Sequence, residues 1–182
     1  MFWSKKFSSL TAALEAPHRA KKLFLLKTGI DAKLSHIERL EKLTTLHIGW
    51  QELKQLPTEI TKLHNLQELI VLNSPIESIL PSIRHLTSLK RLVFRGTGIT
   101  SIPCEIRQLQ QLEEVDFSNN NIQCLPKEIG ELKNLKSLNL HCTSIEKIPD
   151  ELEKLDKLEF LGLAGTKFSE AERSELKLRL EC

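Results

Sequence analysis

Histidine and cysteine are among the residues of this 182-residue chain whose side chains could act as a general base, a nucleophile or a metal ligand. They are scattered, and His141 and Cys142 are the one adjacent pair. A histidine can activate a cysteine thiolate, but neighbouring residues of a strand point to opposite faces, so the two could meet only beyond a strand end. The sequence contains no CxxC, HExxH, GxSxG or GxxxxGKS/T motif. It therefore predicts no enzyme, no metal site and no cofactor.

The segments that must position these side chains are copies of one 23-residue unit. Apolar residues recur at its first, fourth, sixth and eleventh places, followed by an apolar pair three residues apart. The units begin, without insertion or deletion, at Ala20, Leu43, Leu66, Leu89, Leu112, Leu135 and Leu158. Self-similarity at a fixed interval is the signature of a solenoid.

The spacings inside the unit predict its structure. Val115 and Phe117 are two residues apart and therefore share one face of a short strand. Ile129 and Leu132 are three residues apart, which fits a 3₁₀ turn on the opposite side. Stacked units pair their strands into a parallel sheet and join their apolar columns into one core. His47 and His141 then lie four strands apart, roughly 19 Å, too far to act on one substrate atom.

The unit resembles the leucine-rich repeat: LxxLxLxxNxI matches residues 112–122, and LPxxIxxL matches residues 125–132. The resemblance extends over residues 20–168 and is to the 23-residue class of bacterial repeat proteins and of Ras-suppressor and Scribble-type scaffolds. It implies an α/β solenoid, a curved right-handed superhelix of seven repeats with a parallel sheet on its concave side. The ninth place, normally Asn, departs from the family at Thr28, Gln51, Ser74, Thr97, Thr143 and Thr166. We expect the hydroxyls there to bond the same backbone groups with fewer donors.

The two ends are predicted to be helical caps, residues 1–19 and 169–182, around a solenoid of residues 20–168. The N-terminal helix would end at Pro17. Its apolar residues are spaced as one helical stripe: Trp3, Phe7, Leu10 and Leu14. Ser169 and Glu172 have the spacing of a capping box. The residues expected to cover the last apolar edge are Phe168, Leu176 and Leu180.

Composition restricts the class of partner. A net charge of +2 does not favour nucleic acid, and no apolar run approaches the ~20 residues of a membrane helix. Positive charge is concentrated in residues 1–27, either as a solvated cap or as a site for an anionic membrane surface or an acidic protein. Scattered cysteines favour a cytoplasmic location over secretion. Ser8, Ser9, Thr11 and Glu15 interrupt the stretch that would otherwise suit an export signal.

Side chains at the third, fifth, seventh and eighth places should face solvent on the concave side. In the first half these include large apolar groups with a cationic rim, the composition of a binding hot spot. The predicted contacts with a protein partner are His47, Trp50, Ile70, Leu72, Arg91, Val93 and Arg95. The alternatives are weak dimerisation of an otherwise monomeric chain, or no specific role, because sheets favour such residues.

Phe24 and Leu26 belong to the same apolar group and could instead be covered by the N-terminal cap. The later units offer a polar and acidic surface: Glu113, Glu114, Asp116, Ser118, Asn119, Asn139 and His141. The sequence therefore predicts a non-enzymatic protein-interaction module with a preformed surface. An adaptor acting through the basic N-terminal segment is the alternative.

Overall fold

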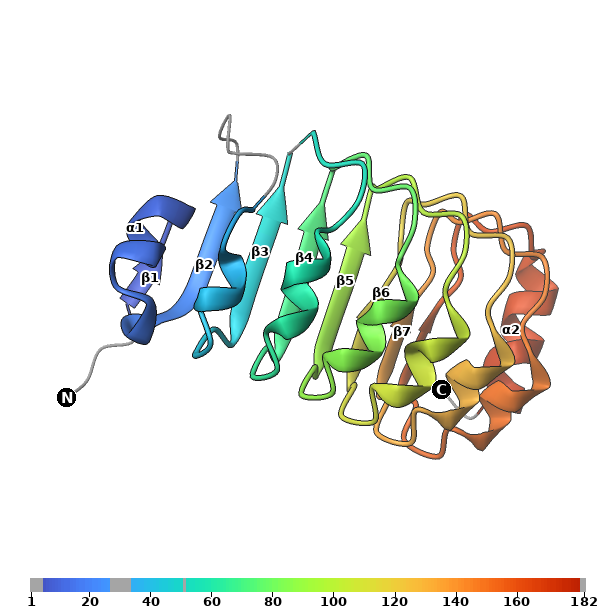
Figure 1. Ribbon diagram of the computed structural model, residues 1–182. Coiled ribbons are helices and arrows are strands. Elements are labelled where there is room, and N and C mark those ends of the chain that lie inside the picture. Colours follow the sequence, from blue (N-terminus) through green and yellow to red (C-terminus); the bar gives the residue numbers. More distant parts are fainter. Residues whose placement is uncertain (1–4, 27–33, 51, 181–182) are drawn as a thin grey trace.

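A computed structural model of the chain describes residues 5–26, 34–50 and 52–180. Within them, one sheet contains eight parallel strands in chain order. The strands are β1 (Lys5–Phe7), β2 (Ala20–Leu26), β3 (Thr45–Gly49), β4 (Glu68–Leu72), β5 (Arg91–Arg95), β6 (Glu114–Asp116), β7 (Ser137–Asn139) and β8 (Phe160–Gly162). The array is curved, with the sheet on its inner side (Figure 1). Trp3, Lys27, Thr28, Ile30, Gln51 and Cys182 lie outside the described residues.

The strand register matches the 23-residue interval of the sequence. From β2 to β8, the fourth place of each unit lies opposite the fourth place of the next, as in Leu46↔Leu69 and Leu69↔Leu92. Identical places therefore stack into columns. Phe94 and Phe117, both at the sixth place, are completely buried. The predicted solenoid with one continuous core is confirmed.

Short 3₁₀ helices return the chain along the outer, convex side (Figure 1). After η1 in the N-terminal segment they are η2 (Ile37–Arg39), η3 (Thr58–Lys62), η4 (Pro81–His85), η5 (Cys104–Gln108), η6 (Lys127–Glu131) and η7 (Asp150–Lys154). Pro57 precedes η3 as its N-cap, whereas Pro81 is the first residue of η4. Proline suits both positions because its φ is already near the helical value and no N–H is needed there. The core lies between these turns and the sheet.

The N-terminal segment differs from the predicted single helix. Phe7 lies in β1 opposite Leu23, and the helix α1 is confined to Leu10–Glu15, followed by η1 (Pro17–Arg19). The extra strand pairs with backbone groups that β2 would otherwise leave exposed at the sheet edge. Ser9 is the N-cap of α1, and its hydroxyl accepts a hydrogen bond from the Ala12 N–H at 3.2 Å. Leu10 is buried and covers the apolar end of the first unit.

Helix α2 (Glu170–Arg179) closes the other end of the array (Figure 1). The predicted capping box is present: the Glu172 N–H donates to Ser169 Oγ at 3.3 Å, and the Ser169 N–H donates to Glu172 Oε2 at 2.8 Å. Leu176 and Leu180 pack against the core. Arg179 forms ion pairs of 3.1 Å and 2.5 Å with Asp150 and Glu153 of η7. These contacts fix α2 to the last repeat.

Candidate functional site

Six of the predicted contact residues lie in β3, β4 and β5 and Trp50 directly follows β3, but two of them are not surface residues. The Ile70 and Val93 side chains are 7% and 2% exposed, whereas Trp50 is 48% exposed. Ile70 and Val93 occupy the fifth place of adjacent strands and lie opposite each other. Strands only about 4.8 Å apart crowd their central side chains together on an inwardly curved face. The expectation that Ile70 and Val93 are exposed is therefore wrong.

The exposed apolar side chains surround a glycine. Leu26 is 39% exposed and lies in the same column as Gly49 and Leu72, the seventh place of the unit. A Cβ added to Gly49 would lie 2.8 Å from Leu26 Cδ2, so the glycine makes room for the leucine. Trp50 follows Gly49, and its N–H donates to the Leu72 carbonyl at 2.9 Å. We call Leu26, Trp50 and the half-buried Leu72 the apolar patch.

The eighth place has a backbone requirement that sequence analysis missed. Its φ angles are positive in every described unit: Trp50 55°, Asn73 47°, Gly96 60°, Asn119 57°, Cys142 53° and Gly165 71°. Glycine tolerates this left-handed conformation freely and asparagine tolerates it well, but a bulky side chain does not. The recurrence of Gly or Asn at this place is the sequence signal that could have revealed it. Trp50 is the bulkiest residue that stands at this place instead of Gly or Asn.

A ladder of side chains runs along one side of the concave face, across β1 to β6. Its members are Lys6, Phe24, His47, Glu68, Arg91 and Glu114. Lys6 Nζ lies 4.0 Å from the Phe24 ring centroid, and the Phe24 and His47 rings meet edge to face at 4.4 Å. The His47 ring contacts Glu68 through Nε2 and Oε1. We call this row the concave ladder.

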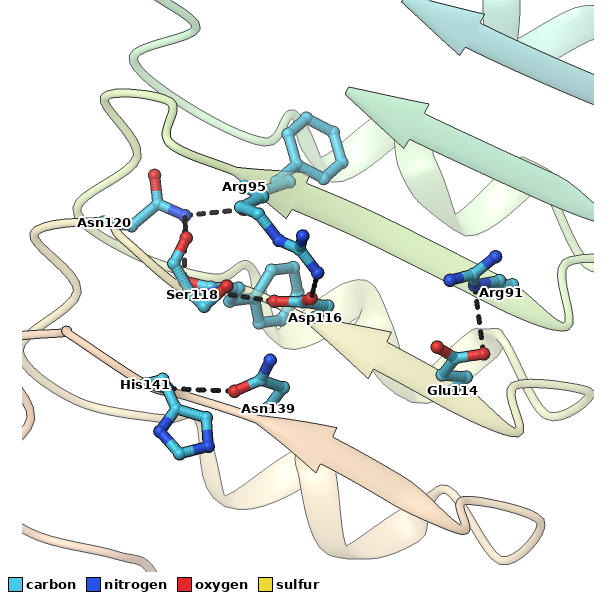
Figure 2. A network of polar contacts seen from close by, with 10 residues as sticks. Arg91, Arg95, Glu114, Asp116, Ser118, Asn120, Asn139 and His141 are labelled. Atoms are coloured by element: carbon cyan, nitrogen blue, oxygen red, sulfur yellow. Dashed lines mark hydrogen bonds and ion pairs between the residues drawn. The ribbon is translucent and has the colours of Figure 1, made fainter. Parts of the chain in front are cut away.

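Arg91 completes the concave ladder between two carboxylates. It lies 3.9 Å from Glu68 Oε1, and its Nε lies 3.0 Å from Glu114 Oε2, the pair shown in Figure 2. The positive charge predicted for this rim is therefore balanced by acidic neighbours. A partner here meets a polar but nearly neutral border.

Arg95, the other predicted rim cation, is also paired. Its Nη2 donates to Asp116 Oδ2 at 2.5 Å, and Asp116 Oδ1 accepts from the Ser118 N–H at 2.9 Å (Figure 2). Burial alone would raise the pKa of Asp116, but the hydrogen bonds from Arg95 and Ser118 lower that pKa below its usual value. Asp116 and Ser118 are buried, so these two residues of the expected polar surface do not face solvent.

At the ninth place Asn120 and Thr143 bond backbone carbonyls as expected, whereas the Thr97 hydroxyl donates to Asn120 Oδ1 at 2.7 Å. Asn120 Nδ2 donates to the Phe94 and Phe117 carbonyls at 2.6 Å and 2.8 Å, and its Oδ1 accepts from the Thr97 N–H at 3.0 Å. Thr143 Oγ1 instead donates one hydrogen bond, to the Leu140 carbonyl at 2.8 Å. Threonine thus serves one of the functions of asparagine with fewer donors.

His141 and Cys142 follow the end of β7, in the turn where their side chains could approach. The His141 N–H donates to Asn139 Oδ1 at 3.1 Å (Figure 2). Cys142 is exposed. Within the described ranges, no hydrogen bond joins the imidazole to the thiol. In the same ranges, no three His, Cys, Asp or Glu side chains gather as a metal ion would require. Nor does any described helix have the length and apolar character of a membrane span.

The basic N-terminal segment lies at one edge of the sheet. Lys6 of β1 is opposite Lys22 of β2, and Lys21 and Lys22 are both exposed. Lys6 is already engaged with Phe24. Leu26, beyond it, is 39% exposed, so the cap does not bury it.

Comparisons with known proteins agree with this geometry. A family model described as a leucine-rich repeat region matches residues 23–118 and 78–179. A leucine-rich repeat protein of Leptospira interrogans is 30% identical with a TM-score of 0.90; the match covers 98% of this chain and 45% of that one. An internalin of Listeria monocytogenes is 19% identical with a TM-score of 0.74, over 96% of this chain and 55% of that one. No curated protein matches the sequence.

A third similar structure is the leucine-rich repeat ectodomain of an Arabidopsis thaliana membrane receptor kinase, solved in complex with Casparian strip integrity factor 2. It is 24% identical with a TM-score of 0.60, over 71% of this chain and 16% of that one. At this identity, it and the internalin show the fold alone. The chain spans between 16% and 55% of the length of the three proteins.

Proposed function

Because the chain belongs to the leucine-rich repeat family, whose domains bind protein partners, we propose that it is a non-enzymatic interaction module. Its concave face binds a protein through the apolar patch of Leu26, Trp50 and Leu72. Ile70 and Val93 lie beside Leu72 on the same concave face but are buried, so they are not expected to contact the partner.

The conformation of Trp50 carries the proposal. A left-handed backbone costs a residue with a side chain roughly 1–2 kcal/mol, and the cost is avoided where Gly or Asn stands. Four of the other described units have Gly or Asn at this place. Trp50 occupies the same conformation with nearly half of its side chain exposed. Strain retained at an exposed aromatic residue points to a function other than folding.

The surroundings of the apolar patch suit a protein. Tryptophan is among the residues most enriched at interface hot spots, and a polar rim around an apolar centre is the usual anatomy of such surfaces. The concave ladder supplies that rim with its charges already paired. The rigid core beneath means that little ordering is required on binding. The partner should therefore be apolar at its centre and nearly neutral at its edge.

Trp50→Asn separates binding from stability. Asn relieves backbone strain, so we expect stability to be unchanged or to rise by up to about 1 kcal/mol. Losing a hot-spot tryptophan should weaken partner binding at least about 30-fold. Affinity capture from a native extract, followed by titration of the retained protein, measures the second effect. Chemical unfolding measures the first.

Cys142→Asn is the matched control, because it makes the same change at the same place far from the apolar patch. It should bind the partner as the unaltered chain does. Equal capture by Trp50→Asn and the unaltered chain would refute the proposal. Sedimentation of the unaltered chain tests the alternative that the patch binds a second copy.

The basic N-terminal segment is the second candidate surface, favoured by the register of Lys6 with Lys22. Binding through it would weaken steeply with added salt and on Lys21→Gln with Lys22→Gln. Partner binding that is insensitive to both, yet lost with Trp50→Asn, assigns the interaction to the apolar patch.

A further inference from the structure

A hollow lies at the far end of the concave face, between β8 and α2. Its volume is about 220 Å³, below the roughly 300–1,000 Å³ of sites for drug-sized ligands. Strand residues form one wall and α2 forms the other. It therefore has room for a group about the size of one amino-acid side chain. Three strands, β5, β6 and β7, lie between β4 of the apolar patch and β8.

The hollow exists because the last unit carries small residues where earlier units carry large ones. Gly162 and Ala164 occupy the places held by Ile70 and Leu72 in β4. A Cβ on Gly162 would lie 2.6 Å from His141 Cδ2, so the glycine lets the imidazole lie over β8. The His141 and Phe160 rings are 6.1 Å apart between centroids, and Phe160 is 45% exposed. These two rings, inclined to each other by 38°, give the hollow an aromatic floor.

The opposite wall is cationic. Arg173 and Lys177 line it, together with one carboxylate, that of Glu170. None of the ion pairs among the described residues involves Arg173 or Lys177. This contrasts with Arg91 and Arg95, which acidic neighbours balance. Arg173 and Lys177 together with Glu170 leave this wall with one positive charge in excess.

The cationic wall is held in place. Arg173 Nη1 donates to the Phe168 carbonyl at 2.7 Å, which orients the guanidinium and leaves its other N–H groups available. Arg179 anchors the end of α2 to η7. The guanidinium is thus preorganised, and its planar donors match the geometry of a carboxylate.

We propose that this hollow binds a carboxylate carried on a small apolar body. The carboxylate lies against Arg173 and Lys177, and the apolar body lies against Phe160 and His141. A single excess positive charge matches a monoanion. The carboxylate can belong to a free small molecule or to the end of a peptide. This site goes beyond the proposed function and does not depend on it.

Phenylacetate is a suitable probe, followed by amide chemical shifts of the ¹⁵N-labelled chain. We expect saturable shifts at Gly162, Ala164 and Gly165, and binding at least tenfold weaker for the neutral phenylacetamide. Lys177→Gln should weaken phenylacetate binding at least threefold. Ala164→Leu fills the hollow without altering charge and should reduce binding at least tenfold. Because Ala164 is exposed, that variant should fold normally.

The matched control is Lys62→Gln with Arg84→Gln, which removes exposed cations from η3 and η4 on the convex side. It should bind phenylacetate as the unaltered chain does. Equal binding of phenylacetamide, tighter binding of inorganic phosphate, shifts confined to other residues, or no effect of Ala164→Leu would each overturn the site.

A second pair of probes distinguishes the two sources of the carboxylate. An acetylated dipeptide ending in phenylalanine is compared with phenylacetate, and its C-terminal amide serves as the control. Tighter binding of the acid dipeptide indicates a chain terminus, whereas tighter binding of phenylacetate indicates a free small molecule. Trp50→Asn should leave both affinities unchanged, so failure here is distinguishable from failure of the proposed function.

Discussion

The two halves of the concave face share one backbone arrangement but carry different kinds of side chain. In β4 and β5 the fifth place holds Ile70 and Val93, which are buried and apolar. In β6 the same place holds Asp116, which is also buried but is bonded to Arg95 and Ser118. Burial at the fifth place of these three strands therefore depends on position rather than on residue type. A polar residue is accommodated there because its neighbours supply partners.

What remains exposed differs accordingly. The first half leaves the apolar patch beside a charge-balanced ladder, and the second half leaves the hollow with its unpaired cations. The core columns beneath are the same in both halves. Specificity on this solenoid therefore depends on the side chains at a few concave places, and stability depends on the core.

The largest expected effect tests whether one core underlies both halves. Phe94→Ala and Phe117→Ala each create a cavity in the sixth column, and each should reduce the free energy of unfolding by about 3–5 kcal/mol. Urea unfolding followed by circular dichroism measures both losses. Phe160→Ala, at an exposed phenylalanine, is the matched control and should lose far less. Markedly unequal losses from the two buried sites would contradict a shared core.

A second variant replaces the polar residue at the fifth place of β6 with an apolar residue, as β4 and β5 have there. Asp116→Val should reduce the free energy of unfolding by about 1–3 kcal/mol at pH 7, because the buried Ser118 N–H loses its acceptor. Asp116→Asn retains an acceptor oxygen and should lose less. Unfolding experiments on the three chains compare these values. A stabilised Asp116→Val would show that the bond network is dispensable.

The same residue should contribute to acid sensitivity. The folded-state pKa of Asp116 is below its usual value, so its stabilisation is present above the unfolded-state pKa of about 3.9 and is lost as pH falls through the folded-state value. The stability difference between the unaltered chain and Asp116→Val should therefore shrink below about pH 4. Unfolding at pH 7 and pH 3 measures this. A difference independent of pH would contradict the assigned cause.

The smallest effect concerns the ninth place, at the boundary between the halves. Asn120→Thr should cost about 1–2 kcal/mol, because one hydroxyl replaces an amide that bonds several backbone groups. Thr143→Val removes a single donor and should cost less. Thermal unfolding compares the two variants. The reverse order would show that the amide network adds nothing beyond one hydrogen bond.

Much of the fold could be predicted from the sequence because it repeats. A fixed 23-residue interval determines which residues stack, and the alternation around Val115 and Phe117 determines which of them face the core. The capping box at Ser169 was equally local, because both partners lie within one turn of the chain. The N-terminal strand was missed because Phe7 also fits a helical stripe, and its pairing with β2 is a tertiary contact.

The candidate site was only partly predictable, for a related reason. The alternation of apolar residues indicates that the side chains of Ile70, Val93 and Arg95 lie on the concave side of the sheet. It does not indicate whether residues of neighbouring strands bury these side chains or form ion pairs with them. That depends on how closely a curved sheet brings together side chains that are 23 residues apart in the chain, as in Ile70 and Val93. The sequence by itself determined the solenoid, its register and its core. The tertiary structure decided which concave side chains are exposed and which charges are balanced, because both depend on distances between units.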